Sequence, residues 1–267
     1  MATDLIGYLL AVLVGVSLGL IGSGGSILTV PILVYVMGVN PILATAYSLF
    51  VVGTTSLVGG VQNAIQKKVD FKTVFIFGIP SIVAVYLTRA YLMPLIPDVL
   101  FSIGDFQFTK PIALMVLFAI VMIFASISMI RPCPHCKDAD AGEIKYNYPM
   151  ILLEGALVGT LTGLVGAGGG FLIIPALVLL AKMPMKLAVG TSLFIIAVKS
   201  LLGFTGDLQG SETIDWTLLS TFTGLSVVGI FIGIFLSKKI EGNKLKSAFG
   251  WFVLVMGIYI LIKELFL

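Results

Sequence analysis

Charged residues are scarce in this chain. Its 267 residues include 16 Lys or Arg and 13 Asp or Glu, so 11% are charged, whereas soluble domains carry roughly 25%. The apolar share is 58% and the mean hydropathy is +1.13. This composition argues against a soluble enzyme, and it excludes a disordered chain because disorder requires low hydrophobicity.

Several sequence signals of other protein classes are also missing. The two cysteines, Cys133 and Cys136, lie in one polar stretch and cannot form a disulfide framework. No P-loop pattern occurs, so we expect no ATP-driven step within this chain. The net charge is only +3, and lysines cluster between apolar runs, which is typical of membrane topology rather than nucleic-acid binding. The first four residues lack a basic region, so we expect no signal peptide.

Long apolar runs are abundant. A transmembrane helix needs about 20 apolar residues, and six uninterrupted runs have this length. They cover residues 44–65, 73–95, 111–130, 187–206, 216–236 and 245–265. The sequence therefore predicts an all-α polytopic membrane protein.

Two further apolar segments are too long for a straight crossing. Residues 5–37 and 148–181 would overshoot a bilayer by about half at roughly 1.5 Å per residue. Each contains a glycine cluster near its middle, at 22–25 and at 166–170. Because glycine clusters break helices and allow the backbone to turn, we expect two broken or re-entrant helices.

The two broken segments belong to an internal repeat. Residues 19–31 align with 163–175 at an offset of 144, and the match continues without a gap to 48–50 and 192–194. Each half then contains one broken segment and three plain spans, which makes about eight helical membrane segments. We expect a first membrane repeat at 1–130, a cytoplasmic linker loop at 131–147 and a second repeat at 148–267.

Lysine and arginine positions predict the orientation of the halves, because these residues are enriched in cytoplasmic loops. If all eight segments crossed, the loop cations would divide seven to seven. If each broken segment returns to its own side, twelve lie inside and only Lys110 and Lys263 lie outside. We therefore expect inverted halves with both termini outside. Inverted repeats with broken helices are a transporter architecture with a site near the midplane.

The glycine breaks are candidate anion sites. A break exposes backbone N–H groups and the positive dipole end of a half-helix, and glycine lets a ligand approach the backbone. The alternative is that these small residues only permit tight helix packing. The candidate residues are Gly22, Ser23, Gly24, Gly25 and Ser26 in the first break and Gly166, Gly168, Gly169 and Gly170 in the second.

The repeated glycine–proline segments 19–31 and 163–175, together with residues 188–193, resemble the TauE/SafE family of sulfite and organosulfonate exporters. The resemblance covers nearly the whole chain. It implies an inner-membrane permease for sulfur-containing anions that works as a homodimer, and it does not fix the substrate. The central Cys133-Pro134-His135-Cys136 sequence is not part of the family pattern.

Lys199 lies in the middle of the apolar run 187–206. A charge at that depth costs roughly 2.5–3.5 kcal/mol on insertion scales and marks a functional pathway, so we interpret Lys199 as a counter-charge for the anion. The alternatives are snorkelling or a structural pair with Glu154. Polar neighbours at helical spacing complete the candidate site. They are Thr191 and Ser192, mirrored by Ser48 in the first half.

Other charged residues within the apolar runs allow two interpretations each. Glu154 is either a proton carrier that couples transport or a solvated residue at headgroup level. We interpret Arg89, near the outer end of its span, as an interface anchor rather than a substrate ligand, which is the alternative, and Asp207 as a helix cap or a solvated residue.

The cysteine pair has three interpretations: a nonessential cytoplasmic loop, a redox couple or half of a zinc site. Zinc needs four ligands, and one loop offers only Cys133, Cys136 and a cramped imidazole, so we expect no metal and no cofactor. The favoured function is secondary export of a small anion. A membrane redox or metal sensor acting through Cys133 and Cys136, and a passive anion channel, are the alternatives.

Overall fold

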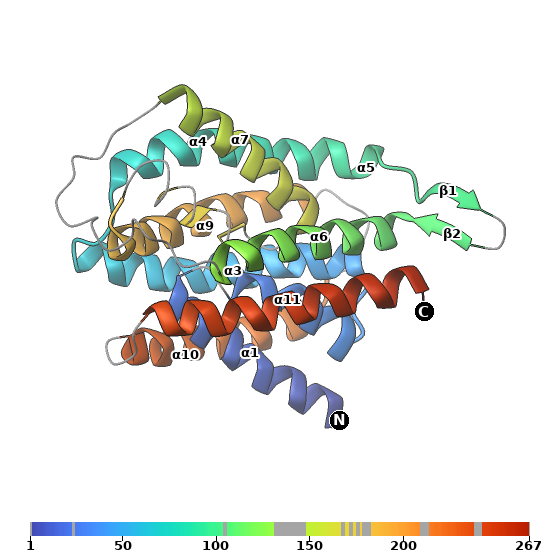
Figure 1. The fold of residues 1–267 in the computed structure, drawn as a ribbon, viewed down its shortest axis with the longest axis horizontal. Coiled ribbons are helices and arrows are strands. Elements are labelled where there is room, and N and C mark those ends of the chain that lie inside the picture. The colour runs from blue at the N-terminus through green and yellow to red at the C-terminus, as the bar shows by residue number, and fades with distance from the viewer. Residues whose placement is uncertain are drawn as a thin grey trace.

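The computed structural model describes residues 2–22, 25–103, 106–130, 148–166, 169–170, 173–174, 177, 183–208, 214–237 and 242–266. This part of the chain is a bundle of helices with one short β-hairpin (Figure 1).

The first half contains most of the short elements. In order they are α1 (Ala2–Ile21), α2 (Ser26–Pro31), the π-helix η1 (Ile32–Val36), α3 (Pro41–Ile65), α4 (Phe71–Leu87), the π-helix η2 (Thr88–Leu92), α5 (Met93–Leu95), β1 (Val99–Ile103), β2 (Phe106–Thr109) and α6 (Lys110–Ile130). The second half contains α7 (Tyr148–Val165), α9 (Met185–Asp207), α10 (Trp216–Ser237) and α11 (Gly242–Phe266).

Among the described residues, five helices are long and apolar enough to cross a membrane. They are Pro41–Ile65, Phe71–Leu95, Lys110–Ile127, Leu187–Asp207 and Trp216–Ser237. Each falls on one of the six apolar runs in the sequence, and the sixth run coincides with α11. The expectation of a helical, multi-pass membrane protein is therefore confirmed.

The helices begin where side chains satisfy their free N–H groups. The Asn40 side chain accepts a hydrogen bond from the Ile42 N–H at 2.9 Å, and Pro41 occupies the first turn of α3. Asp70 caps α4, and Asp215 caps α10 by accepting from two backbone N–H groups at 3.0 Å. Asp70 and Asp215 occupy matching places in the two halves.

Both long segments break at their glycine clusters. Helix α1 ends at Ile21 and is followed by Gly22 with φ +80°, and α7 ends at Val165 and is followed by Gly166 with φ +73°. A left-handed backbone at these points is readily adopted only by glycine, so the glycine pattern explains why each helix ends there. The helix ends lie inside the bundle, where Gly22 and Gly166 are buried.

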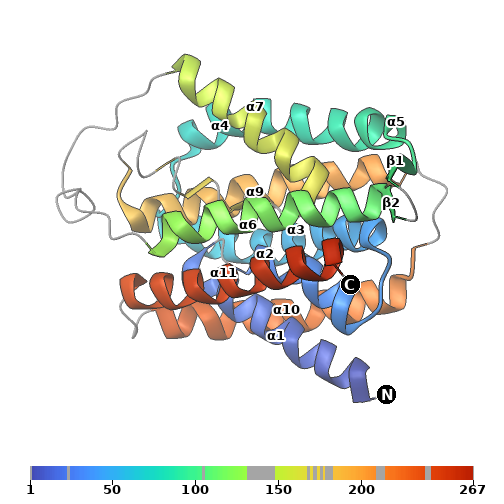
Figure 2. The same ribbon diagram turned by 45° about the vertical axis from the view of Figure 1, so that its right-hand side comes forward.

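The principal helix contacts join the two halves of the chain. Helix α1 packs on α10, α3 on α9, α4 on α7, and α6 on α11. Figure 2 shows α6 and α11 lying side by side on the viewer's face of the bundle. Helices α3 and α9 are the most buried of the five long spans, whereas the others expose large apolar side chains outward. An outward apolar surface of this kind suits contact with lipid.

A β-hairpin extends beyond the helices, which the sequence reasoning did not predict. Strands β1 and β2 pair antiparallel, with Val99 opposite Thr109 and Phe101 opposite Phe108. The Phe101 and Phe108 rings stack with centroids 4.8 Å apart. The start of α1 and the end of α11 lie at the same end of the bundle as this hairpin (Figure 1).

Candidate functional site

The Lys199 side chain is fully buried at the second glycine break. Lys199 lies in the middle of α9, and its ammonium donates a hydrogen bond to Thr162 Oγ1 at 3.1 Å. Thr162 belongs to the last turn of α7, and its hydroxyl in turn donates to the Val158 carbonyl at 2.6 Å. A Cβ built on Gly169, where φ is +60°, would lie 2.8 Å from the Lys199 Nζ. The cation and the backbone of the break are therefore direct neighbours.

The structure does not bring Lys199 and Glu154 together. Glu154 lies on α7 eight residues before Thr162, which corresponds to about 12 Å along the helix. It is partly exposed, and no hydrogen bond or ion pair joins it to Lys199 in the portion of the chain that is described. The hypothesis of a structural Lys199–Glu154 pair is therefore not supported, and the Lys199 ammonium is held by a neutral hydroxyl.

The first glycine break has a matching environment, with no cation among its described neighbours. A Cβ on Gly22 would lie 2.5 Å from the Val189 side chain, and a Cβ on Gly166 would overlap Thr45. Val189 and Thr45 are themselves 144 residues apart, the offset of the repeat. The position that corresponds to Lys199 is Thr55, which is buried. The two breaks are thus alike in backbone and packing but different in charge.

The other candidate polar residues are all buried, with different roles. The Thr191 hydroxyl accepts a hydrogen bond from the Asp70 N–H at 2.9 Å, which ties α9 to the start of α4. The Ser192 hydroxyl donates to the Val189 carbonyl of its own helix at 2.9 Å. Ser48 Oγ, by contrast, has no hydrogen-bond partner among the atoms described. Thr191 is therefore a structural link, whereas Ser48 has hydrogen-bonding capacity to offer.

Unpartnered polar atoms recur along one face of α3. The Ser48 and Thr55 hydroxyls and Gln62 Oε1 are buried without a hydrogen-bond partner in the described structure. These residues follow one another at intervals of seven, so they lie on one face of the helix. Ser192 and Lys199 occupy the equivalent face of α9. Each central helix thus carries a polar stripe through an apolar bundle.

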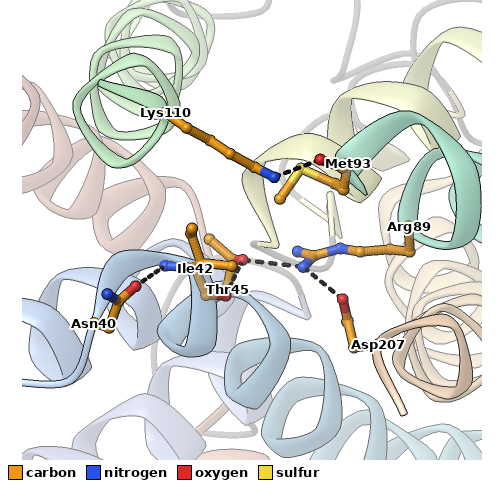
Figure 3. Close-up of polar contacts among 7 residues, drawn as sticks. All are labelled: Asn40, Ile42, Thr45, Arg89, Met93, Lys110 and Asp207. Carbon is orange, nitrogen blue, oxygen red and sulfur yellow. Dashed lines mark hydrogen bonds and ion pairs between the residues drawn. The ribbon is translucent and has the colours of Figure 1, made fainter. Parts of the chain in front are cut away.

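Sequence reasoning misjudged Arg89 and Asp207. Arg89 is 2% exposed, and its Nη1 donates to Asp207 Oδ1 at 3.1 Å and to Thr45 Oγ1 at 3.0 Å (Figure 3). The interface-anchor interpretation of Arg89 is wrong, and so is the capping or solvated role of Asp207. The available signal was a cation within an apolar run, which usually marks a pair or a pathway.

Buried cations outnumber buried carboxylates in the interior. Lys110, at the start of α6, is buried, and its ammonium donates to the Met93 carbonyl (Figure 3). With Lys199 and Arg89, it makes three buried cations, whereas no carboxylate in the described ranges is buried to the same degree. The excess positive charge suits a negatively charged ligand.

Some predicted site residues lie outside the described residues. These are Ser23, Gly24, Gly168, Cys133 and Cys136. Of the remaining break residues, Gly25, Ser26, Gly169 and Gly170 are buried. Within the described ranges no group of three or more His, Cys, Asp or Glu residues is arranged to hold a metal ion.

The fold and the interior charges define a multi-pass membrane protein of the transporter class. A model of the sulfite exporter TauE/SafE family matches residues 7–260, and the chain belongs to this family. The resemblance seen in the glycine–proline segments is thereby confirmed.

Curated relatives carry matching descriptions. The chain is 30% identical to a probable membrane transporter protein of Xylella fastidiosa strain 9a5c, over 93% of this chain and 91% of the relative. It is 27% identical to the probable membrane transporter protein YunE of Bacillus subtilis, over 96% and 97% of the two chains. A probable membrane transporter protein of Methanocaldococcus jannaschii is 28% identical over 95% of each chain. No solved structure gives a significant match.

Proposed function

We propose that this protein is a secondary transporter that exports a small sulfur-containing anion, such as sulfite or an organosulfonate, across the cytoplasmic (inner) membrane. The observation that carries this proposal is the fully buried Lys199 ammonium beside the Gly166–Gly170 break. The anion is held between the ammonium and the backbone N–H groups of the break, and alternating access moves it across the membrane.

The energetics of Lys199 favour a transported counter-ion. A cation in the middle of a span is costly, and its hydrogen bond from Nζ to Thr162 Oγ1 contributes no opposite charge. An anion supplies that charge at the moment of binding. A ligand shifts the equilibrium between two conformations only by its difference in affinity for them, so the anion drives alternating access by relieving the cost of the buried cation more in one conformation than in the other.

Repeated helix contacts support a repeat of two units, residues 1–130 and 148–267, and the loop charges support its inversion. Gly15 of α1 lies against Ser226 and Gly229 of α10, and Gly159 of α7 lies against Ser81 and Ala84 of α4. The offsets between these matching contacts are 144 and 145 residues, as between the halves of the sequence. Each broken segment therefore packs on the third long helix of the other half.

The orientation proposed from the sequence places both termini outside and the linker 131–147 in the cytoplasm. The common location of the start of α1 and the end of α11 supports this arrangement (Figure 1). The family resemblance adds a homodimer as the working assembly. Glu154 is the proposed coupling group, because it is the acidic residue within α7, the helix that precedes the Lys199 site.

The test is uptake into proteoliposomes of sulfite, thiosulfate, sulfoacetate and taurine, with and without a proton gradient. We expect at least one of these anions to accumulate against its own gradient when protons drive it. Equilibration without accumulation would instead indicate a passive channel.

A variant in which Cys133 and Cys136 are both replaced by Ser provides the matched control. Transport should persist in it, because neither thiol belongs to the proposed anion path. Loss of transport in this variant alone would support the redox or metal-sensing alternative.

A further inference from the structure

The buried Arg89–Asp207 ion pair leaves much of its hydrogen-bonding capacity unused. The Arg89 side chain is fully buried, and its Nη1 makes both contacts, to Asp207 and to Thr45. Nε and Nη2 of Arg89 and Oδ2 of Asp207 have no hydrogen-bond partner among the residues described. Buried donors of this kind are rare in proteins and call for a partner.

The two unused nitrogens of Arg89 form a fork. Nε–H and Nη2–H lie on the same edge of the planar guanidinium and point in parallel, the arrangement that binds two oxygens of one oxyanion. Asp207, which contacts only Nη1 and through only one oxygen, leaves that edge free. Arg89 and Asp207 are thus joined by one contact, and the Nε–Nη2 edge of Arg89 remains available to bind two oxygens.

A second buried cation lies at the same end of the bundle as Arg89. Met93, whose carbonyl accepts a hydrogen bond from the Lys110 ammonium, lies four residues and hence about one helical turn after Arg89. Lys110 is thus a second buried cation at this end of the bundle, and Asp207 is the carboxylate that contacts Arg89 (Figure 3). The π-helix η2, which carries Arg89, is a type of irregularity often found at functional sites.

The position of Arg89 connects it with the Lys199 site. Thr45 accepts a hydrogen bond from Arg89 and also packs against Gly166, where an added Cβ would overlap it. Lys199 lies next to Gly169 of the same break. Asp207 follows Lys199 by eight residues on α9, or about 12 Å along the helix. The two cations therefore flank opposite ends of the second glycine break.

We propose that Arg89 is a second anion subsite, which takes two oxygens of a sulfite- or sulfonate-like oxyanion on its Nε–Nη2 edge. Asp207 is the resident counter-charge that keeps the affinity low, so the anion passes from Lys199 to Arg89 and then leaves. This proposal rests on the proposed function and deepens it, because it adds a second station and a requirement for at least two oxygens on one substrate group.

The binding test uses the purified full-length chain, with methanesulfonate as the oxyanion and chloride as a monatomic control. Lys199→Met should lose thermal stabilisation by methanesulfonate at concentrations that saturate the unchanged protein. Adding Asp207→Asn to Lys199→Met should restore it, with an apparent affinity about tenfold or more above that of Lys199→Met, since the guanidinium loses the counter-charge that lowers its affinity for anions. Chloride should not replace methanesulfonate.

Asp215→Asn in the Lys199→Met background is the matched control, because Asp215 is an acidic helix cap with no contact to Arg89 among the described residues. It should restore nothing. Suppose that the unchanged protein binds methanesulfonate but the double variant, Lys199→Met with Asp207→Asn, does not. The proposal of an anion subsite at Arg89 is then wrong, while the proposed function stands. Binding by the double variant but not by the unchanged protein would uphold the subsite and overturn the role of Lys199. Equal thermal stabilisation by chloride would show that binding does not require two oxygens on the Nε–Nη2 edge of Arg89.

A second variant covers the case in which Asp207→Asn does not fold. Arg89→Lys keeps the charge for Asp207 but removes the second donor edge. It should keep methanesulfonate-induced stabilisation through Lys199 and should lower the export rate by about tenfold. An unchanged export rate for Arg89→Lys would overturn the subsite.

Discussion

At the residue scale, the Lys199 ammonium is the group on which the proposed function depends most directly. In Lys199→Met we expect unfolding stability to be unchanged or higher, because a costly buried charge is removed, and anion-induced stabilisation to be lost. Lys199→Arg should keep the charge yet impair transport, since a planar fork does not replace a compact ammonium. Thermal unfolding with and without sulfite is the measurement.

Lys68→Met is the control for this pair of variants, because Lys68 is partly exposed and its ammonium donates a hydrogen bond to the exposed Gln66 side chain at 2.6 Å. It should behave like the unchanged protein in both measurements. Sulfite-induced stabilisation that persists in Lys199→Met would remove the direct-ligand role.

The backbone of the second break allows an independent test. Gly169→Ala should cost about 1–3 kcal/mol of stability for the left-handed backbone alone. It should also lose sulfite binding, because the added Cβ would lie 2.8 Å from the Lys199 Nζ. Gly38→Ala is the matched control, since Gly38 has φ +68° with nothing within 4 Å of the added carbon. It should lose stability but keep binding. Equal sulfite binding by both variants would indicate that the glycines of the break serve helix packing and not anion binding.

The sequence could predict the role of a single residue when the signal lay within neighbouring residues, and not when it depended on a partner far away in the sequence. Lys199 was identifiable because one cation in a long apolar run is a local signal. The same local signal was present at Arg89, but its partner Asp207 lies 118 positions away, so the ion pair itself could not be predicted from local sequence. The burial of Thr191 was predictable, whereas its hydrogen bond to the Asp70 backbone was not, because it depends on how α9 meets α4.

At the scale of helices, glycine decides how closely α1 approaches α10. A Cβ on Gly15 would overlap the Ser226 carbonyl, so Gly15→Ala should lower stability by about 1–3 kcal/mol through overpacking. Gly159→Ala should lose a similar amount against Ser81, because it is the counterpart of Gly15 in the repeat. The midpoint of thermal unfolding in detergent measures both.

Gly224→Ala serves as the control for these two variants. Gly224 lies on α10 with open space around an added Cβ, so its replacement should leave stability unchanged or slightly higher. Losses that differ widely between Gly15→Ala and Gly159→Ala would contradict the equivalence of the two halves.

Helices were predicted well where long apolar runs and glycine clusters mark their extent, and other elements were predicted poorly. The six plain runs and the two breaks follow from one-dimensional patterns, since span length and helix ends are set locally. The hairpin of β1 and β2 was missed because its strands are four and five residues long and merge with the flanking spans. The π-helices η1 and η2 have no sequence signature that we recognise.

At the scale of the whole molecule, the inverted arrangement predicts which loops share a side of the membrane. In a chain with Cys133 and Cys136 replaced by Ser, single cysteines at Lys67 and Ser237 should react only after the cytoplasm is opened. A cysteine at Leu208 should react with an impermeant maleimide on intact cells. All three positions are exposed in the structure. Labelling of Lys67 and Ser237 from opposite sides would show that the second broken segment, which lies between them, crosses fully.

The packing of α1 on α10 has a consequence for biosynthesis. The Ser226 hydroxyl donates to the Ala11 carbonyl at 3.0 Å, across 215 residues of chain. At about 5–20 residues per second, the ribosome needs roughly 10 to 40 seconds to supply that partner. During this interval the small-residue face of α1 lacks its partner α10, whereas the other broken helix, α7, is made after its partner α4. A nascent chain of this protein therefore depends on lipid or the insertion machinery to shelter α1 until the second half arrives.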